Sequence, residues 1–299
     1  METIESLIRR IKSAEDLHSV VRTMKALAAV SIRQYEKAVE SLAEYNRAVE
    51  MGFQVILKQK PPGIKLAKPV VNGHLVAIVF GSDQGMVGQF NEVIARYAAG
   101  ELEKKKSRSR NIHILAAGAR VSARLQEAGQ GVEDLIGLPG SAAAITPVVH
   151  SVVRKVEVWR SERGVDEVLL FFNRPLSGAS YTPHTTQLLP VDLKWFQDLE
   201  HKAWPGRAVP FFTIDWQTLF SLLIREYLFV SVYRSFAESL AGENASRLAS
   251  MQAAERNIEN RLQELTTQFH QQRQSAIDAE LFDLVAGFEA LSGGERELL

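Results

Sequence analysis

The chain has 299 residues and 46% of them are hydrophobic, enough for a sizeable core in one large domain or two small ones. Lysine plus arginine and aspartate plus glutamate each total 35, so the zero net charge removes any general electrostatic case for nucleic acid or an anionic membrane. The absence of cysteine excludes disulfides and thiolate chemistry. Without a signal peptide or an apolar run of roughly 18–20 residues, we expect a soluble, cytoplasmic protein.

Residues 1–60 are expected to form one long coiled-coil helix. They contain no proline and only Gly52, and Pro61-Pro62 then ends the pattern. A mean apolar step of 3.5 residues predicts a left-handed coiled coil on the order of 85 Å long. The expected seam is Leu7, Ile11, Ala14, Leu17, Val21, Met24, Ala28, Ile32, Tyr35, Val39, Leu42, Asn46, Val49, Phe53 and Ile56.

Residues 69–200 change period and predict a Rossmann-like parallel α/β domain. Short β-rich runs alternate with amphipathic stretches, which favours a parallel sheet covered by helices on both faces. The expected strands are His74–Phe80, Asn111–Ala117, Asp166–Asn173 and, at an edge, Tyr181–Leu189; the helices are Gly88–Lys106, Gly118–Ala128 and Ala142–Arg163. The basic run Glu103–Arg110 is interpreted as a solvated helix end rather than a binding site.

Helical composition returns at residues 216–291, after a turn-rich foot at 201–215. The apolar residues again step by threes and fours, with Glu255 the charged member of the seam Leu248, Met251, Glu255, Ile258, Leu262, Leu265 and Phe269. Each long helix has a seam that it cannot bury alone. The expected fold is therefore an antiparallel coiled coil of the N- and C-terminal helices, with the α/β domain inserted between them.

The most enzyme-like segment is the glycine-rich loop at residues 81–88, which follows a strand. Its spacing departs from that of a dinucleotide-binding loop, and no Gly-Lys-Ser or Gly-Lys-Thr follows. We interpret Gly81, Gly85 and Gly88 as residues of a structural turn. The seven histidines fall singly, without the helical spacing of a zinc site. We expect no catalytic residue, bound cofactor or metal.

Polar side chains on the long helices are more ambiguous. The residues alone favour a solvated coiled-coil face over a binding surface. The candidates are Arg22, Met24, Lys25 and Arg33 on the first helix, and Arg247, Arg273, Gln274, Asp278, Glu280 and Asp283 on the second.

Three segments resemble the gamma subunit of F-type ATP synthases. LIRRIKSAEDLHSVVRTMKALAAVSI, at residues 7–32, is similar to the family's opening helix, and GSDQGMVGQFN is similar to its middle-domain loop. Residues 239–291 resemble its closing signature most specifically. The sequence departs from the family pattern at His18 and Ser19. Val87 stands for the loop cysteine, and Asp278 stands for a threonine. These departures suggest a divergent bacterial type, such as the alternate or sodium-motive branch.

The resemblance implies a non-catalytic rotor shaft. Partners would be the hexamer of alpha and beta subunits, the epsilon subunit and the membrane c-ring, with the complex at the cytoplasmic face of the bacterial inner membrane. Carried over residue by residue, the beta-subunit contacts would be Met24, Lys25, Arg247, Arg273, Gln274, Glu280 and Asp283.

Two other function classes stay open on the residues alone. The loop at 81–88 leaves room for a nucleotide-cofactor-binding enzyme, which would bind NAD or ATP as an isolated chain. The paired seams would also suit a coiled-coil scaffold with no role in energy conversion. Such a scaffold would need the seams but not Arg247, Arg273 and Gln274.

Overall fold

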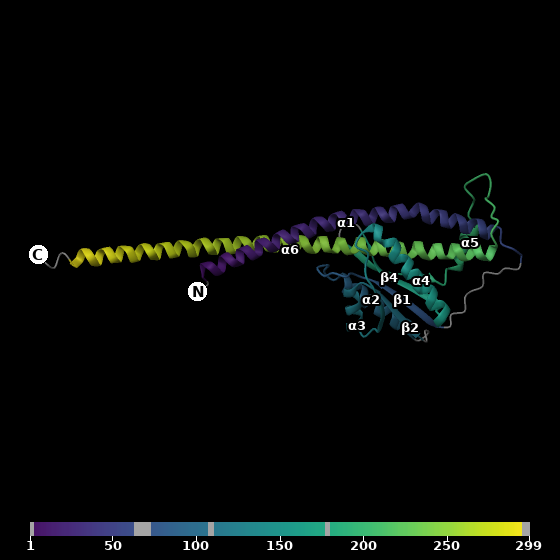
Figure 1. Cartoon of the computed structure of the whole chain (residues 1–299), viewed down its shortest axis with the longest axis horizontal. Coiled ribbons are helices and arrows are strands. Elements are labelled where there is room, and N and C mark those ends of the chain that lie inside the picture. Colours follow the sequence, from purple (N-terminus) through teal and green to yellow (C-terminus); the bar gives the residue numbers. More distant parts are fainter. Residues whose placement is uncertain (1–2, 63–72, 107–110, 177–179, 295–299) are drawn as a thin grey trace. The chain divides into compact units, whose positions relative to one another are not determined.

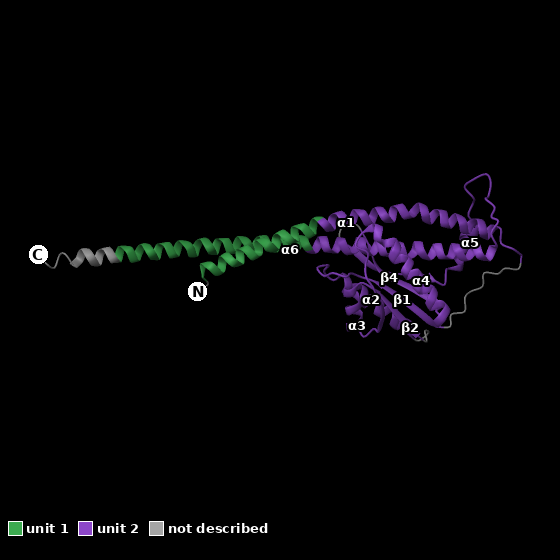
Figure 2. Ribbon diagram, viewed as in Figure 1, with its two compact units in different colours: residues 1–26, 251–299 green, residues 27–250 purple. Residues whose placement is uncertain are grey.

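The computed structural model describes residues 3–62, 73–106, 111–176 and 180–294, with side chains described as far as residue 286 (Figure 1). Two helices account for much of the chain: α1 (Ile4–Lys58) and α6 (Trp216–Gly294). Two compact units divide it, with residues 1–26 and 251–299 in unit 1 and residues 27–250 in unit 2 (Figure 2). Both long helices pass from one unit into the other.

Unit 2 contains a five-stranded sheet with the order β3-β2-β1-β4-β5. Four strands are parallel, and β5 pairs antiparallel with β4 at the edge. The strands are β1 (His74–Phe80), β2 (Asn111–Ala117), β3 (Val132–Ile136), β4 (Glu167–Pro175) and β5 (Tyr181–Leu189). The helices between and after them are α2 (Phe90–Lys106), α3 (Ala119–Glu127), α4 (Ile145–Arg163) and α5 (Leu193–His201).

Alternate residues of the central strands enter two separate cores. Leu75, Ala77 and Val79 of β1 pack with α2 and α3 on one face. Val76, Ile78 and Phe80 pack on the other face with α4 and with the parts of α1 and α6 in this unit. The strands are buried on both faces, which explains why they read as continuous apolar runs in the sequence.

A third core lies where α1 ends and α6 begins. Phe53 makes ring contacts with Trp195, Phe196 and Phe220 at centroid distances of 5.4 to 6.0 Å. Trp216 donates from its indole nitrogen to the carbonyl of Ile56 over 2.9 Å. Aromatic packing thus joins the two helix ends and α5 within unit 2.

Unit 1 contains an antiparallel helix pair, because Lys25 contacts Glu255 and His18 contacts the later residue Glu259. The expected fold class, an antiparallel coiled coil with an inserted parallel α/β domain, is therefore confirmed. None of the helices in the described part of the chain combines the length and apolarity that a bilayer crossing requires.

The structure corrects two details of the sequence analysis. Strand β3 was missed, because VEDLI alternates polar and apolar residues weakly and lies at a sheet edge. Leu17 was expected in the seam but is 53% exposed, and His18 is half-buried in its place. Before residue 53, the buried positions of α1 fall on one seven-residue line: Leu7, Val21, Ala28, Tyr35, Leu42 and Val49, with Ala14 half-buried on the same line. Residues 53–57 are all buried. Of the basic run, residues 107–110 lie outside the described residues.

Candidate functional site

The glycine-rich loop after β1 is packed too tightly at its first residue for any side chain. A Cβ at Gly81 would lie 2.3 Å from the Cβ of Val121 and 2.5 Å from Oδ1 of Asn91. Asn91 accepts from the backbone N–H of Ser82 over 2.9 Å and donates to the Ser82 hydroxyl over 2.8 Å. The glycine therefore allows α2 and α3 to approach the end of β1.

Asp83 fills the place where an anion would meet the start of α3. Its carboxylate accepts from the backbone N–H of Ala119 and from that of Leu138, each over 2.8 Å. A helix N-terminus favours a bound anion, and here the chain supplies that anion itself. The backbone N–H groups at the start of α3 are therefore already paired within the chain.

The end of the same loop rests on α6. The Ser246 hydroxyl donates to the carbonyl of Val87 over 2.7 Å. Gly88 has a φ of +55°, and a Cβ there would lie 3.4 Å from Oγ of Ser250. Gly85 is open, with the nearest atom, from Arg120, 3.9 Å away. Two of the three glycines, Gly81 and Gly88, therefore meet a steric or backbone requirement.

Arg247 lies in a buried ion pair of unit 2. Its guanidinium donates to Glu243 over 2.6 Å and to the amide oxygen of Asn244 over 3.2 Å, and the side chains of Arg247 and Glu243 are 11% and 7% exposed. Burial raises the pKa of Glu243, and the Arg247 charge opposes that rise. Burial, followed by the Glu243 charge, also raises the pKa of Tyr35. In this structure Arg247 is held by its own chain.

Met24 and Lys25 lie in the paired segment of unit 1, which we define as residues 4–26 with 251–272. The Lys25 ammonium donates to a carboxylate oxygen of Glu255. This hydrogen bond is the main cause that lowers the pKa of Glu255, and the charges of His18 and Arg22 add to it. Met24 is half-buried beside this pair. Lys25 therefore already has a carboxylate partner within the chain.

The remaining candidates lie on the exposed end of α6, which we define as residues 273–286. Every side chain in this stretch is exposed, including Arg273, Gln274, Glu280 and Asp283. Large apolar side chains are exposed there too, at fractions of 47% to 73%: Ile277, Leu281, Phe282, Leu284 and Val285. Steps of three and four residues from Phe269 and Gln272 continue the seam to Ala276, Ala279 and Asp283. The large apolar residues of this stretch therefore do not lie at seam positions. An apolar helix surface of this kind indicates a partner.

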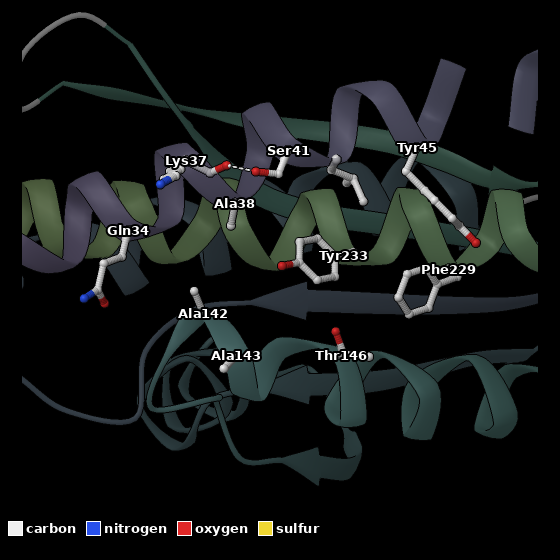
Figure 3. Close-up of a pocket in the computed structure, with 11 residues that line it drawn as sticks. Gln34, Lys37, Ala38, Ser41, Tyr45, Ala142, Ala143, Thr146, Phe229 and Tyr233 are labelled. Carbon is white, nitrogen blue, oxygen red and sulfur yellow. Dashed lines mark hydrogen bonds between the residues drawn. The ribbon is translucent and has the colours of Figure 1, made fainter. Parts of the chain in front are cut away.

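An open groove of about 480 Å³ lies in unit 2 (Figure 3). One wall comes from α1, the facing wall from the 3-10 turn Ala142–Ala144 and the first turn of α4, and Phe229 and Tyr233 of α6 lie between them (Figure 3). Tyr45, at one end, donates to Glu226 over 2.6 Å, and this bond raises the pKa of Tyr45 to about 12. The groove contains none of the candidate contact residues.

Sequence reasoning missed the polar residues that the fold places inside its helix pairs. The sequence analysis did not single out Glu243 or Glu238, although both are buried and pair with arginines. His18 was passed over in favour of Leu17. The available signal was the seven-residue spacing of Ile11, His18, Lys25 and Ile32, which places them on one line along the helix. The adjacent line, three or four residues away, contains the buried residues Leu7, Val21, Ala28 and Tyr35.

The chain matches the family model described as ATP synthase over residues 3–291. It is 26% identical to the ATP synthase gamma chain of Granulibacter bethesdensis, over 97% of this chain and 100% of that one. It is also 26% identical to the gamma chain of Syntrophus aciditrophicus, over 98% and 100%.

Solved structures share the fold. In the rotor of the Euglena gracilis mitochondrial ATP synthase in rotational state 1, the TM-score is 0.60 at 15% identity, over 92% of this chain and 98% of that one. A second structure of that enzyme, in rotational state 3, gives a TM-score of 0.63 at 16% identity, over 98% and 95%. With its paired terminal helices, inserted sheet and full-length match, the chain belongs to the ATP synthase family, as a gamma-type chain.

Proposed function

We propose that the chain is the central rotor shaft of an F-type ATP synthase, in which the exposed end of α6 lies inside the hexamer of alpha and beta subunits. The observation that carries this proposal is the stretch from residue 273 to 286, where five large apolar side chains face solvent beside Arg273 and Gln274. A helix surface of this composition is stable in a partner's cavity and costly in water.

The shaft takes no part in the chemistry of ATP. The catalytic sites belong to the hexamer, and the asymmetric shaft biases their nucleotide affinities as it turns, which is a coupling free energy between distant sites. The gamma chain is a non-catalytic subunit, peripheral to the membrane. We place the complex at the cytoplasmic face of a bacterial inner membrane, with the epsilon subunit and c-ring as further partners.

Besides Met24, which is half-buried, the residues proposed to contact the beta subunit fall into two groups. Arg273, Gln274, Glu280 and Asp283 are exposed and free to meet another chain without rearrangement. Lys25 and Arg247 already pair with Glu255 and Glu243. Contact through these two would require the partner's carboxylate to compete with a bond already made, so we assign the larger share of the coupling to Arg273 and Gln274.

The test is a double substitution, Arg273→Ala with Gln274→Ala, in the assembled complex. We expect ATP-driven ion pumping to fall several-fold relative to ATP hydrolysis. Without the guanidinium and the amide, the shaft loses contacts with the beta subunit that couple its rotation to hydrolysis. The matched control is Arg261→Ala with Gln263→Ala, which removes the same side-chain types from an exposed stretch of the same helix. Equal pumping-to-hydrolysis ratios in the two variants would contradict this assignment.

Assembly itself is tested by recovering the tagged chain from its native membranes. We expect the alpha and beta subunits, and ATPase activity, to elute with it after gentle extraction. Recovery of the chain alone, from membranes whose ATPase stays intact and elutes elsewhere, would overturn the rotor assignment and favour an unrelated coiled-coil scaffold.

A further inference from the structure

The helix pair of unit 1 brings together three side chains of metal-ligand type that are far apart in the sequence. His18 comes from α1, whereas Glu255 and Glu259 come from α6 and are one helical turn apart. One nitrogen or oxygen of each lies within 4.8 Å of the other two, and no second such group occurs among the residues that the structure describes. The spacing of the histidines could not reveal this cluster, because its other members lie more than 230 residues away.

The histidine nitrogen is the observation that points to a ligand. Nε2 of His18 is buried and makes no hydrogen bond to any atom of the described residues. It lies 3.5 Å from Oε1 of Glu259. A ring nitrogen of histidine can bind either a proton or a metal ion, and carboxylates beside it favour either cation.

We propose that His18, Glu255 and Glu259 bind a zinc-class divalent cation that links α1 to α6 in unit 1. Zinc binds nitrogen and carboxylate oxygen at about 2.0–2.2 Å, so tetrahedral ligands lie about 3.4 Å apart. The three ligand atoms, now within 4.8 Å of one another, would close to that separation around the ion. The exposed fractions of 28% for His18 and 56% for Glu259 leave a path for the ion and a position for water.

Two cations compete with the metal for this cluster. Lys25 occupies one oxygen of Glu255 and leaves the carboxylate its second, and Arg22 adds positive charge nearby. Lys25 therefore orients Glu255 but lowers the affinity of the site for a metal ion. We expect the occupancy of the site to depend on the metal concentration, unlike that of a permanently filled structural site. An imidazole ligand selects zinc, copper, nickel or cobalt over magnesium, which prefers an all-oxygen shell.

The test is a titration of the purified full chain with Zn²⁺ against a chromophoric chelator, with Co²⁺ as a spectroscopic probe. We expect one ion per chain, d–d bands of a four-coordinate Co²⁺ site, and no displacement by millimolar Mg²⁺. His18→Gln and Glu259→Gln should each weaken Zn²⁺ binding at least about 10-fold, the scale seen on losing even an outer-shell partner. Lys25→Met should tighten it.

The matched controls are His270→Gln and Glu264→Gln, which remove the same side-chain types from exposed positions of α6 in the same unit. We expect both to bind Zn²⁺ within twofold of the parent chain, and helicity by circular dichroism checks that every variant is folded. Absence of one-to-one binding, an unchanged affinity in His18→Gln, or displacement by Mg²⁺ would each overturn the proposal. Because the readout is metal bound by the free chain, its failure leaves the rotor assignment standing.

Discussion

The two long helices pair in both units, but what surrounds the pair differs. In unit 2, α6 between residues 228 and 246 is buried on several sides, because the sheet and α4 cover it as well as α1. In the paired segment of unit 1, the fully buried α6 side chains are Met251 and Leu265, and the seam includes Lys25, His18 and Glu255. The same kind of helix therefore holds the fold in one unit and presents its surface to other molecules in the other.

The largest effect should come from a matched pair of phenylalanines on α6. Phe236 is fully buried with its ring 4.7 Å from Phe80, whereas Phe282 is 73% exposed. Phe236→Ala should lower the free energy of unfolding by about 3–5 kcal/mol, and Phe282→Ala should change it by less than about 0.5 kcal/mol. Urea unfolding of the free chain measures both. Similar losses of unfolding free energy in the two variants would contradict the proposed difference between the two regions of α6.

The buried pair in unit 2 should respond strongly to loss of one partner. Arg247→Met leaves Glu243 buried and unpaired, at a cost of about 3–5 kcal/mol near neutral pH. The double variant Glu243→Leu with Arg247→Met should recover most of this loss, because no charge stays buried. A double variant no more stable than the single one would show that the pair itself, rather than its unpaired charge, dominates.

The same single variant predicts a pH dependence with a defined sign. Burial raises the pKa of Glu243 above 4.5, so the folded state binds its proton more tightly than the unfolded state does. Without Arg247 that rise is larger. The stability of Arg247→Met should therefore recover as pH falls toward 4.5 and be lost as pH rises through the folded-state pKa. A pH-independent deficit, measured by unfolding at several pH values, would count against this account.

The loop after β1 should tolerate alanine at one glycine and not at another. Gly81→Ala places a Cβ 2.3 Å from Val121 and should cost about 1–3 kcal/mol through overpacking. Gly85→Ala meets no atom closer than 3.9 Å and should be close to neutral. Thermal unfolding of the two variants compares them directly, and equal midpoints would refute the steric reason given for Gly81.

The smallest effect should come from the ion pair of unit 1. Lys25 holds the pKa of Glu255 below 4.5, so this pair contributes stability above that pH and loses it as the pH falls through the lowered pKa. Lys25→Met should lower the free energy of unfolding slightly at pH 7, and should lessen its further loss as the pH falls below 4.5. An unchanged acid profile would mean that the pair does not couple the two helices.

Periodicity in the sequence was enough to predict both long helices and the parallel sheet. The position of the α/β domain between the two helices then predicted that the helices pair antiparallel. Periodicity could not decide whether Leu17 or His18 faces the other helix, because both positions fit a step of three or four residues. Only the packing of the facing helix determines which of the two is buried. Likewise, Glu243 interacts electrostatically with Asp83 and with Tyr35 of α1, which are distant from it in sequence. The large apolar residues after 272 depart from the phase of the seam in the sequence, and the proposed function assigns the surface that covers them to another chain.

The central claim is that the exposed end of α6 is covered by the catalytic hexamer. The chain has no cysteine, so Phe282→Cys gives a single thiol there, and Gln126→Cys on α3 of unit 2 gives an exposed control. Thiol labelling should be fast at both positions in the free chain. After assembly with alpha and beta subunits, labelling at 282 should slow by orders of magnitude while labelling at 126 stays fast. Equal labelling rates at 282 in the free and assembled chain would contradict the account.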